Sequence, residues 1–165
     1  HCSWLAAQGQ GRDYADEIVR EIIARGIYVC RTIAGFERIP LEEATPNHRF
    51  WPDYEVFRKM VKDGVKLAAG SDAGIDETPI AGFAYTLETM AGLGGMSPQA
   101  VLASATRVAA EAIGLADRVG TLEVGKRADA IAVSGNPLED LRVLRQPHVV
   151  IRDGQVVARD GRVIA

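Results

Sequence analysis

The sequence has little cysteine and no long apolar run. Its two cysteines, Cys2 and Cys30, lie far apart and outside any Cys-x-x-Cys spacing, so neither a zinc knuckle nor a disulfide framework is indicated. We therefore expect reduced, buried thiols. No apolar stretch is long enough to span a membrane and no secretory apolar segment opens the chain, so we expect a cytoplasmic protein with no membrane partner.

An excess of charge of one sign is also lacking. The chain has 19 Lys and Arg against 22 Asp and Glu, and the basic residues are interleaved with acidic ones. Such a pattern gives no footprint for nucleic acid. The 47% hydrophobic and 25% charged residues are typical of a globular protein with a core and argue against disorder. The chain begins with His1, so three origins stay open: a processed product, an engineered piece or the remainder of something longer.

One carboxylate follows a short, mostly apolar stretch, residues 65–69. Asp72 is flanked by small residues, and Gly70 and Gly74 permit the turns that would aim its side chain. A desolvated, unpaired carboxylate costs several kcal/mol, so a closed site would need a cation or hydrogen-bond donors. Two interpretations stay open on these residues alone. Asp72 is either a metal or acid/base residue, or a cap for the next turn or helix.

The first half of the chain alternates between two periodicities. Apolar residues at helical spacing predict helices over residues 13–26, with Asp13 as N-cap, and 52–64. Strands are predicted after each, at 27–30 and 65–69. The stripe expected to be buried on the second helix is Tyr54, Phe57, Met60 and Val61. The order helix, strand, helix, strand is typical of parallel β/α units, whose sites lie beyond the carboxyl ends of the strands.

Beyond Asp72 the pattern is first helical and then β. Helices are predicted over 82–93, from an N-cap at Ser97 with Pro98 in the first turn, and over 106–114. We place a boundary near residues 115–120. The strands predicted after it are 130–133, 149–151, 155–157 and 162–164, with hairpin turns at Asp153-Gly154 and Asp160-Gly161.

Three stretches of this chain resemble the carboxyl-terminal part of the amidohydrolase superfamily, specifically its imidazolonepropionase-like and Xaa-Pro-dipeptidase-like members. They are His1-Cys2-Ser3, residues 70–74 and the tail from Met96 to Ala130. The tail is the most specific, because residues 120–129 read Gly-x-Leu-x-x-Gly-Lys-x-Ala-Asp. The likeness covers essentially the whole chain.

The resemblance implies an α/β fold with the last units of a (β/α)8 TIM barrel over residues 1–117 and strands of a small β-sandwich over 118–165. It implies a metal-dependent amidohydrolase acting on a small-molecule amide or peptide, namely a dipeptide, an N-acyl amino acid or a cyclic amide. His1 and Asp72 would bind a divalent metal, with zinc expected, and Asp72 would also take the proton of the hydrolytic water.

Two further residues are candidates for substrate binding. His48 lies in a long loop of the kind that lines a barrel mouth, although a solvated loop histidine is the alternative. Arg31 follows a predicted strand and could hold a substrate carboxylate with its guanidinium, or form a surface ion pair instead. We interpret His148 as structural, and Lys126 and Asp129 as parts of an ordered turn.

The resemblance also shows what this chain lacks. The family's first-strand histidine pair, its fourth-strand lysine and its fifth-strand histidine have no counterpart, and a complete barrel takes about 250 residues. We therefore expect a partial chain that needs the missing amino-terminal part of the barrel. Homo-oligomer formation stays open. The alternative is a non-catalytic fragment or association module, because an interrupted sheet exposes edges that invite pairing.

This expectation makes a first prediction. The purified 165-residue chain, supplied with zinc alone, should show nil or weak hydrolysis of dipeptides, N-acyl amino acids and cyclic amides in a steady-state assay. Turnover by this chain without a partner fragment would contradict it.

Overall fold

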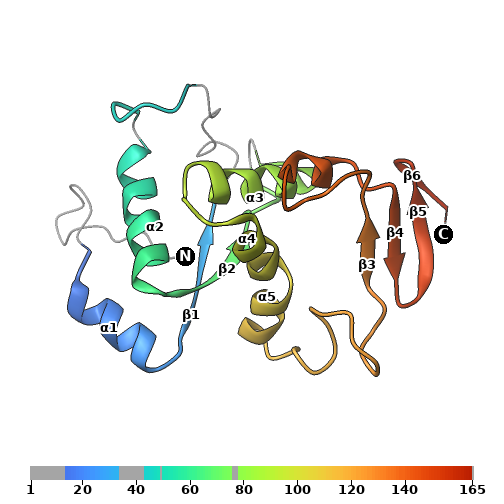
Figure 1. Ribbon diagram of the computed structural model, residues 1–165, viewed down its shortest axis with the longest axis horizontal. Coiled ribbons are helices and arrows are strands. Elements are labelled where there is room, and N and C mark those ends of the chain that lie inside the picture. The colour runs from blue at the N-terminus through green and yellow to red at the C-terminus, as the bar shows by residue number, and fades with distance from the viewer. Residues whose placement is uncertain (1–13, 34–42, 49, 76–77, 165) are drawn as a thin grey trace.

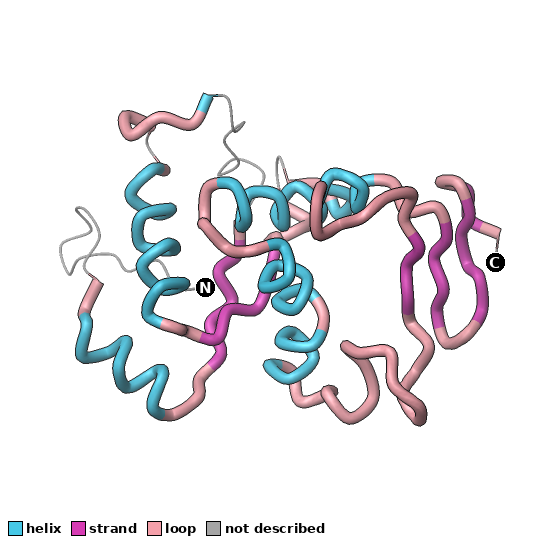
Figure 2. The backbone as a smooth tube through the Cα atoms, in the orientation of Figure 1, coloured by secondary structure: helices cyan, strands magenta, loops and turns pink. Residues whose placement is uncertain are grey.

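The computed structural model describes residues 14–33, 43–48, 50–75 and 78–164. Over these residues the chain forms two sheets and five α-helices. A pair of strands lies among the helices, and a separate four-stranded sheet stands at the carboxyl-terminal end (Figures 1 and 2). The predicted α/β fold is therefore confirmed.

The first sheet is a parallel pair. Helix α1 (Asp16–Ala24) leads into β1 (Tyr28–Thr32), and α2 (Trp51–Asp63) leads into β2 (Lys66–Gly70). The strands pair in register from Tyr28 opposite Lys66 to Thr32 opposite Gly70, as expected for β/α units.

Glycines end both helices. Gly26 has φ 64° after α1, and Gly64 has φ 82° after α2, a conformation that L side chains rarely adopt. The predicted stop at Gly26 is confirmed. The N-cap predicted at Asp13 lies outside the described residues.

The hydrophobic core forms where α2 covers one face of this pair. Phe57 and Met60 from α2 are 1% and 0% exposed, as the helical stripe predicted. They share a cluster with buried residues from both sheet strands and from later helices: Val29, Ile33, Leu67, Leu87, Met90 and Val101. The face of the strands that carries Val29 and Ile33 is thus the face turned toward the helices.

Three helices follow β2. They are α3 (Phe83–Gly92), preceded by the short 3-10 turn η3 (Ile80–Gly82), then α4 (Pro98–Ala105) and α5 (Arg107–Ala112). The predicted cap of α4 is confirmed, because the Ser97 hydroxyl oxygen accepts a hydrogen bond of 3.2 Å from the Ala100 amide and Pro98 occupies the first turn.

The carboxyl-terminal sheet is antiparallel and its strands follow chain order. They are β3 (Ala130–Ala132), β4 (Val149–Arg152), β5 (Gln155–Arg159) and β6 (Arg162–Val163). Both predicted hairpins are confirmed, and their turn residues take the positive φ that a tight two-residue turn needs: 52° and 80° at Asp153-Gly154, 48° and 74° at Asp160-Gly161.

The link between the two sheets is ordered by its own hydrogen bonds. Lys126 Nζ donates to Thr121 Oγ1 at 2.6 Å, and the Asp129 carboxylate accepts from the Asp153 amide at 2.7 Å. Gly120 has φ 96°, and a Cβ there would lie 2.6 Å from the Ala110 Cβ. These contacts support the interpretation of Lys126 and Asp129 as structural residues.

Two expectations about β1 were wrong. Cys30 was expected to be a buried thiol, but it is a free, exposed cysteine. The reason is strand alternation, because Cys30 lies on the face opposite the buried Val29. The strand was also expected to begin at Ile27, which is 45% exposed and precedes the strand. Within the described residues, no helix is long and apolar enough to cross a membrane.

The burial of Phe57 in the core predicts how much stability its removal would cost. Phe57→Ala should lower the free energy of unfolding by about 3–5 kcal/mol, because it leaves a cavity in the packed interior. Ile80→Ala, at a site 81% exposed, is the control and should change it by less than about 0.5 kcal/mol. Urea unfolding followed by circular dichroism measures both, and equal losses in the two variants would contradict this placement of the core.

The strand pair makes a second structural prediction. A Cβ on Gly70 would lie 2.5 Å from Cys30 Sγ, so Gly70→Ala should destabilise the chain by about 1–3 kcal/mol. Cys30→Ala removes the clashing sulfur, and the double variant should recover most of that loss. Purely additive unfolding energies would show that the two residues do not meet.

Candidate functional site

Asp72 lies two residues beyond the carboxyl end of β2. It is half-buried and has φ 56°, an uncommon conformation for a non-glycine residue that aspartate tolerates better than most. The segment 71–75, which we call the Asp72 loop, therefore leaves the strand through a sharp turn that sets the direction of this side chain.

Backbone hydrogen bonds hold the Asp72 loop on both sides. Before it, the Ile33 amide donates to the Gly70 carbonyl at 3.0 Å and joins the ends of the two strands. After it, the Gly74 amide donates to the Thr78 carbonyl at 3.1 Å, and the Thr78 amide donates to the Ile75 carbonyl at 3.1 Å. Thr78 is 1% exposed, so the loop closes onto a buried residue.

The end of β1 is fixed by α3. Thr86 is fully buried, and its hydroxyl donates to the Ile33 carbonyl at 3.2 Å. The Ile33 carbonyl thus accepts a hydrogen bond from α3, and the Ile33 amide donates one to the Gly70 carbonyl. Asp72 emerges from a strand end that is tied to its neighbour strand and, through it, to a helix.

Arg31 lies on the helix-facing side of β1. In the strand alternation it shares a face with Val29 and Ile33, both buried in the core cluster, and its Nη1 donates to the Thr32 carbonyl. The sequence analysis expected Arg31 to follow the strand, which was wrong, because the strand continues to Thr32 and includes Arg31. A substrate role for Arg31 stays a prediction.

His48 helps to form the turn that begins α2. Its Nδ1 accepts from the Phe50 amide at 3.3 Å, and its carbonyl accepts from the Trp51 amide at 2.9 Å. The segment that leads into α2 lies at the end of the molecule toward which β1 points (Figure 1), the same end as Asp72. The structure thus places His48 and Asp72 at one end of the α/β part, and contact with substrate stays a prediction for both.

His1, the other predicted metal ligand, lies outside the described residues. Among the residues that the structure does describe, no group of three or more His, Cys, Asp or Glu side chains is placed to hold a metal ion. A catalytic zinc commonly takes three protein ligands, so Asp72 and its described surroundings do not by themselves fit a complete centre. We assign no catalytic step to a metal.

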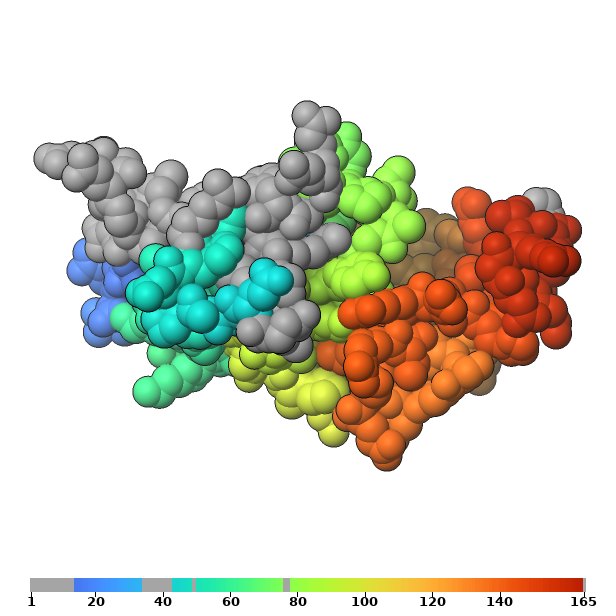
Figure 3. Space-filling model, turned by 90° about the horizontal axis from the view of Figure 1, so that it is seen from above, coloured from blue at the N-terminus to red at the C-terminus, as the bar shows by residue number. Residues whose placement is uncertain are grey.

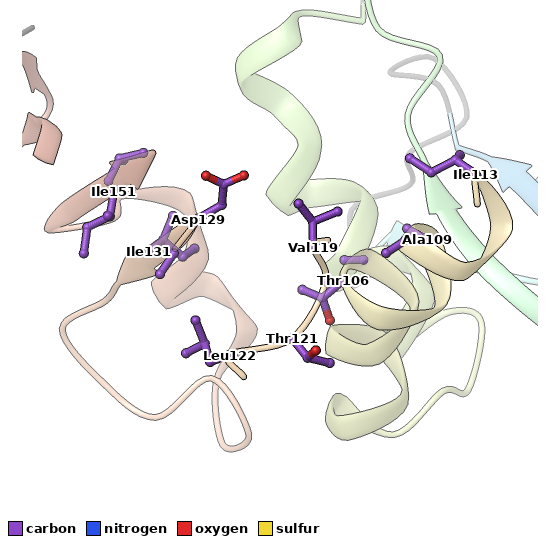
Figure 4. A pocket seen from close by; sticks show the side chains of 14 residues that line it. Thr106, Ala109, Ile113, Val119, Thr121, Leu122, Asp129, Ile131 and Ile151 are labelled. Atoms are coloured by element: carbon purple, nitrogen blue, oxygen red, sulfur yellow. The ribbon is translucent and has the colours of Figure 1, made fainter. Parts of the chain in front are cut away.

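Sequence reasoning missed a large groove remote from Asp72. It has a volume of about 720 Å³ and lies between α4–α5 and the strands β3 and β4 (Figure 4). Small residues such as Ala109 line one side and branched residues such as Ile131 and Ile151 line the other. Its one charged lining residue, Asp129, is occupied by the Asp153 amide. The groove offers no acid/base residue free of such a structural contact, so we place the candidate site at Asp72.

Known proteins resemble this chain in sequence. It is 40% identical over 78 residues to an imidazolonepropionase from Mesorhizobium japonicum, a match that covers 47% of this chain and 18% of that protein. It is 34% identical over 97 residues to ochratoxinase from Aspergillus niger, covering 58% of this chain and 19% of that protein. The chain thus matches less than a fifth of the length of either relative.

Solved structures resemble it over nearly the whole fold. A Xaa-Pro dipeptidase crystallised with methionine in its active site superposes with a TM-score of 0.70 at 33% identity, over 85% of this chain and 36% of that one. The A. niger ochratoxinase superposes with a TM-score of 0.71 at 25% identity, over 98% of this chain and 37% of that one.

These matches confirm the resemblance found in the sequence. The model of the amidohydrolase family matches residues 8–157, which is most of the chain. The protein described here therefore belongs to the amidohydrolase family.

Proposed function

We propose that this chain is the part of a hydrolase that supplies the acid/base carboxylate, Asp72, for cleaving a C–N bond in a small-molecule amide or peptide. The observation that carries the proposal is the position of Asp72, just beyond the carboxyl end of a parallel strand in a member of the amidohydrolase family. Sites of parallel β/α proteins lie at that edge. A dipeptide, an N-acyl amino acid and a cyclic amide are the substrate classes we expect.

The same proposal includes the architecture of the longer protein. Residues 1–117 would form the last units of a (β/α)8 barrel, and residues 118–165 part of a β-sandwich. The parallel pairing of β1 and β2 supports the first assignment, since parallel sheets in α/β proteins are covered on both faces. The four-stranded antiparallel sheet supports the second.

The chemistry asked of Asp72 is the transfer of one proton. As water attacks the amide carbon, the carboxylate takes a proton from the water, and the hydroxyl remains on the acyl product. As the C–N bond breaks, the same proton passes to the nitrogen of the leaving amine. The Asp72 loop is held by backbone hydrogen bonds on both sides, and a loop fixed in this way needs little reorganisation when substrate binds.

The proposal includes a divalent metal, with zinc expected, for which this chain would supply only some of the ligands. Asp72 and His1 would be two of its ligands, and the others would come from outside the described residues. His48 and Arg31 are the proposed substrate contacts.

One observation favours an alternative. Among the residues that the structure describes, β1 and β2 pair only with each other, and outer strand edges can pair with another chain. A non-catalytic association module would use those edges and would not need Asp72. The two proposals differ in what they require of this carboxylate.

The proposal is tested by Asp72→Asn in the intact protein. The amide keeps the size of the side chain but cannot accept the proton, so kcat for amide hydrolysis should fall by about 10²–10⁴-fold. Asp117→Asn, at an exposed aspartate in the link to the tail, is the matched control and should leave kcat unchanged.

Metal content, measured by plasma mass spectrometry on the same samples, separates the roles of Asp72. Zinc lost together with activity supports a ligand role as well as a proton-transfer role, whereas zinc kept with activity lost supports proton transfer alone. Full activity in Asp72→Asn would overturn the proposal and favour the association module.

A further inference from the structure

A side-chain clamp joins the carboxyl-terminal tail, here residues 118–165, to α3. It is formed by Arg145, the last residue of the 3-10 segment η4 (Leu141–Arg145) between β3 and β4. Arg145 Nε donates to one Glu88 carboxylate oxygen at 2.6 Å and its Nη2 to the other at 2.5 Å. The guanidinium carbon also lies 4.2 Å from the centre of the Tyr85 ring. Such two-point pairing fixes direction as well as distance.

The clamp sits on packed structure. Leu141 is 8% exposed and belongs to the same core cluster as Leu87 and Met90 of α3, and Leu144 packs against that cluster. Figure 3 shows the orange surface before β4 lying against the green surface of α3. The Glu88 side chain is 14% exposed and that of Arg145 is 38% exposed, so solvent screens this ion pair in part.

The charge on Arg145 does not vary across the physiological pH range. Its hydrogen bonds with Glu88 are the largest cause that raises the pKa of Arg145 above its usual value. The guanidinium is already protonated at neutral pH. The clamp is therefore a constant contact of the folded protein and not a pH switch.

From the clamp, a continuous series of contacts runs to the Asp72 loop. Tyr85 and Glu88 flank Thr86, whose hydroxyl donates to the Ile33 carbonyl from the buried side of α3. The Ile33 amide in turn donates to the carbonyl of Gly70, two residues before Asp72. The helix is thus held by the tail on one side and holds the strand ends on the other.

We propose that Arg145 is a positioning residue for Asp72: by fixing α3 it fixes Thr86 and, through Ile33 and Gly70, the strand end from which the Asp72 loop emerges. Its consequence for catalysis rests on the proposed function of Asp72, but the coupling itself does not. The tail bears no catalytic candidate, but through the Arg145–Glu88 contact it would help to position Asp72.

The test compares two arginines in the intact protein. Arg145→Met keeps an apolar stem and removes the bonds to Glu88. Arg142→Met is the matched control, because Arg142 also bonds a carboxylate through Nε and Nη2, at 2.8–3.0 Å, but its partner Asp140 lies two residues away in the same segment. Hydrogen exchange read by mass spectrometry reports on peptides that cover residues 70–75 and, as a reference, α2.

Arg145→Met should speed exchange in residues 70–75 on the order of tenfold, the scale of one lost charge-assisted hydrogen bond, and leave α2 unchanged. Arg142→Met should change neither peptide. Thr86→Val removes only the hydroxyl that bonds the Ile33 carbonyl. If both residues act through the same contacts, the double variant with Arg145→Met should speed exchange less than the sum of the two single effects. Arg145→Lys, which keeps the charge, should restore part of the protection.

Unchanged exchange in residues 70–75, or an equal rise in these residues and in α2, would overturn the inference, since the second outcome is what mere loss of stability produces. The two proposals fail separately. Fast exchange in Arg145→Met combined with full activity in Asp72→Asn would uphold the coupling and overturn the proposed function. Unchanged exchange combined with an inactive Asp72→Asn would do the reverse.

Discussion

The structure depends on one junction, where the Ile33 amide donates to the Gly70 carbonyl while the Ile33 carbonyl accepts from Thr86. At this point two parallel strands and α3 share a single residue that is 2% exposed. Buried backbone groups must find partners, and here the partners of Ile33 come from two elements, Gly70 of β2 and Thr86 of α3. The junction therefore sets the relative positions of the strand ends, and with them the place where Asp72 leaves the sheet.

Close packing reinforces the junction from both faces. On the helix side, Val29, Ile33 and Leu67 join the core under α2 and α3. On the other side, a Cβ on Gly70 would lie 2.5 Å from Cys30 Sγ, so a side chain there would force the sulfur to move. Two parallel strands are few for a sheet, which agrees with a chain that matches less than half the length of its solved relatives.

Local signals were sufficient to predict most elements from the sequence. Ser97 with Pro98, and the Asp-Gly pairs of the tail, specify their turns through contacts a few residues apart, and the stripe on α2 specifies its buried face. Contacts between distant residues could not be predicted in this way. Nothing near Arg145 identifies Glu88, 57 residues earlier, as its partner, and the exposure of Cys30 depends on which face of β1 the helices cover. For the candidate site, the sequence nominated Asp72, but it could not predict the contacts of α3 with Ile33 and with Arg145.

The central claim is that the Asp72 carboxylate faces the reacting amide at the carboxyl ends of the strands. A crystal structure of the intact protein with a bound phosphonate analogue of the tetrahedral intermediate tests this most directly. We expect an Asp72 carboxylate oxygen within about 3 Å of a phosphonate oxygen, the reach that proton transfer requires. An analogue bound elsewhere, with both Asp72 oxygens engaged only by amides of its own loop, would contradict the claim.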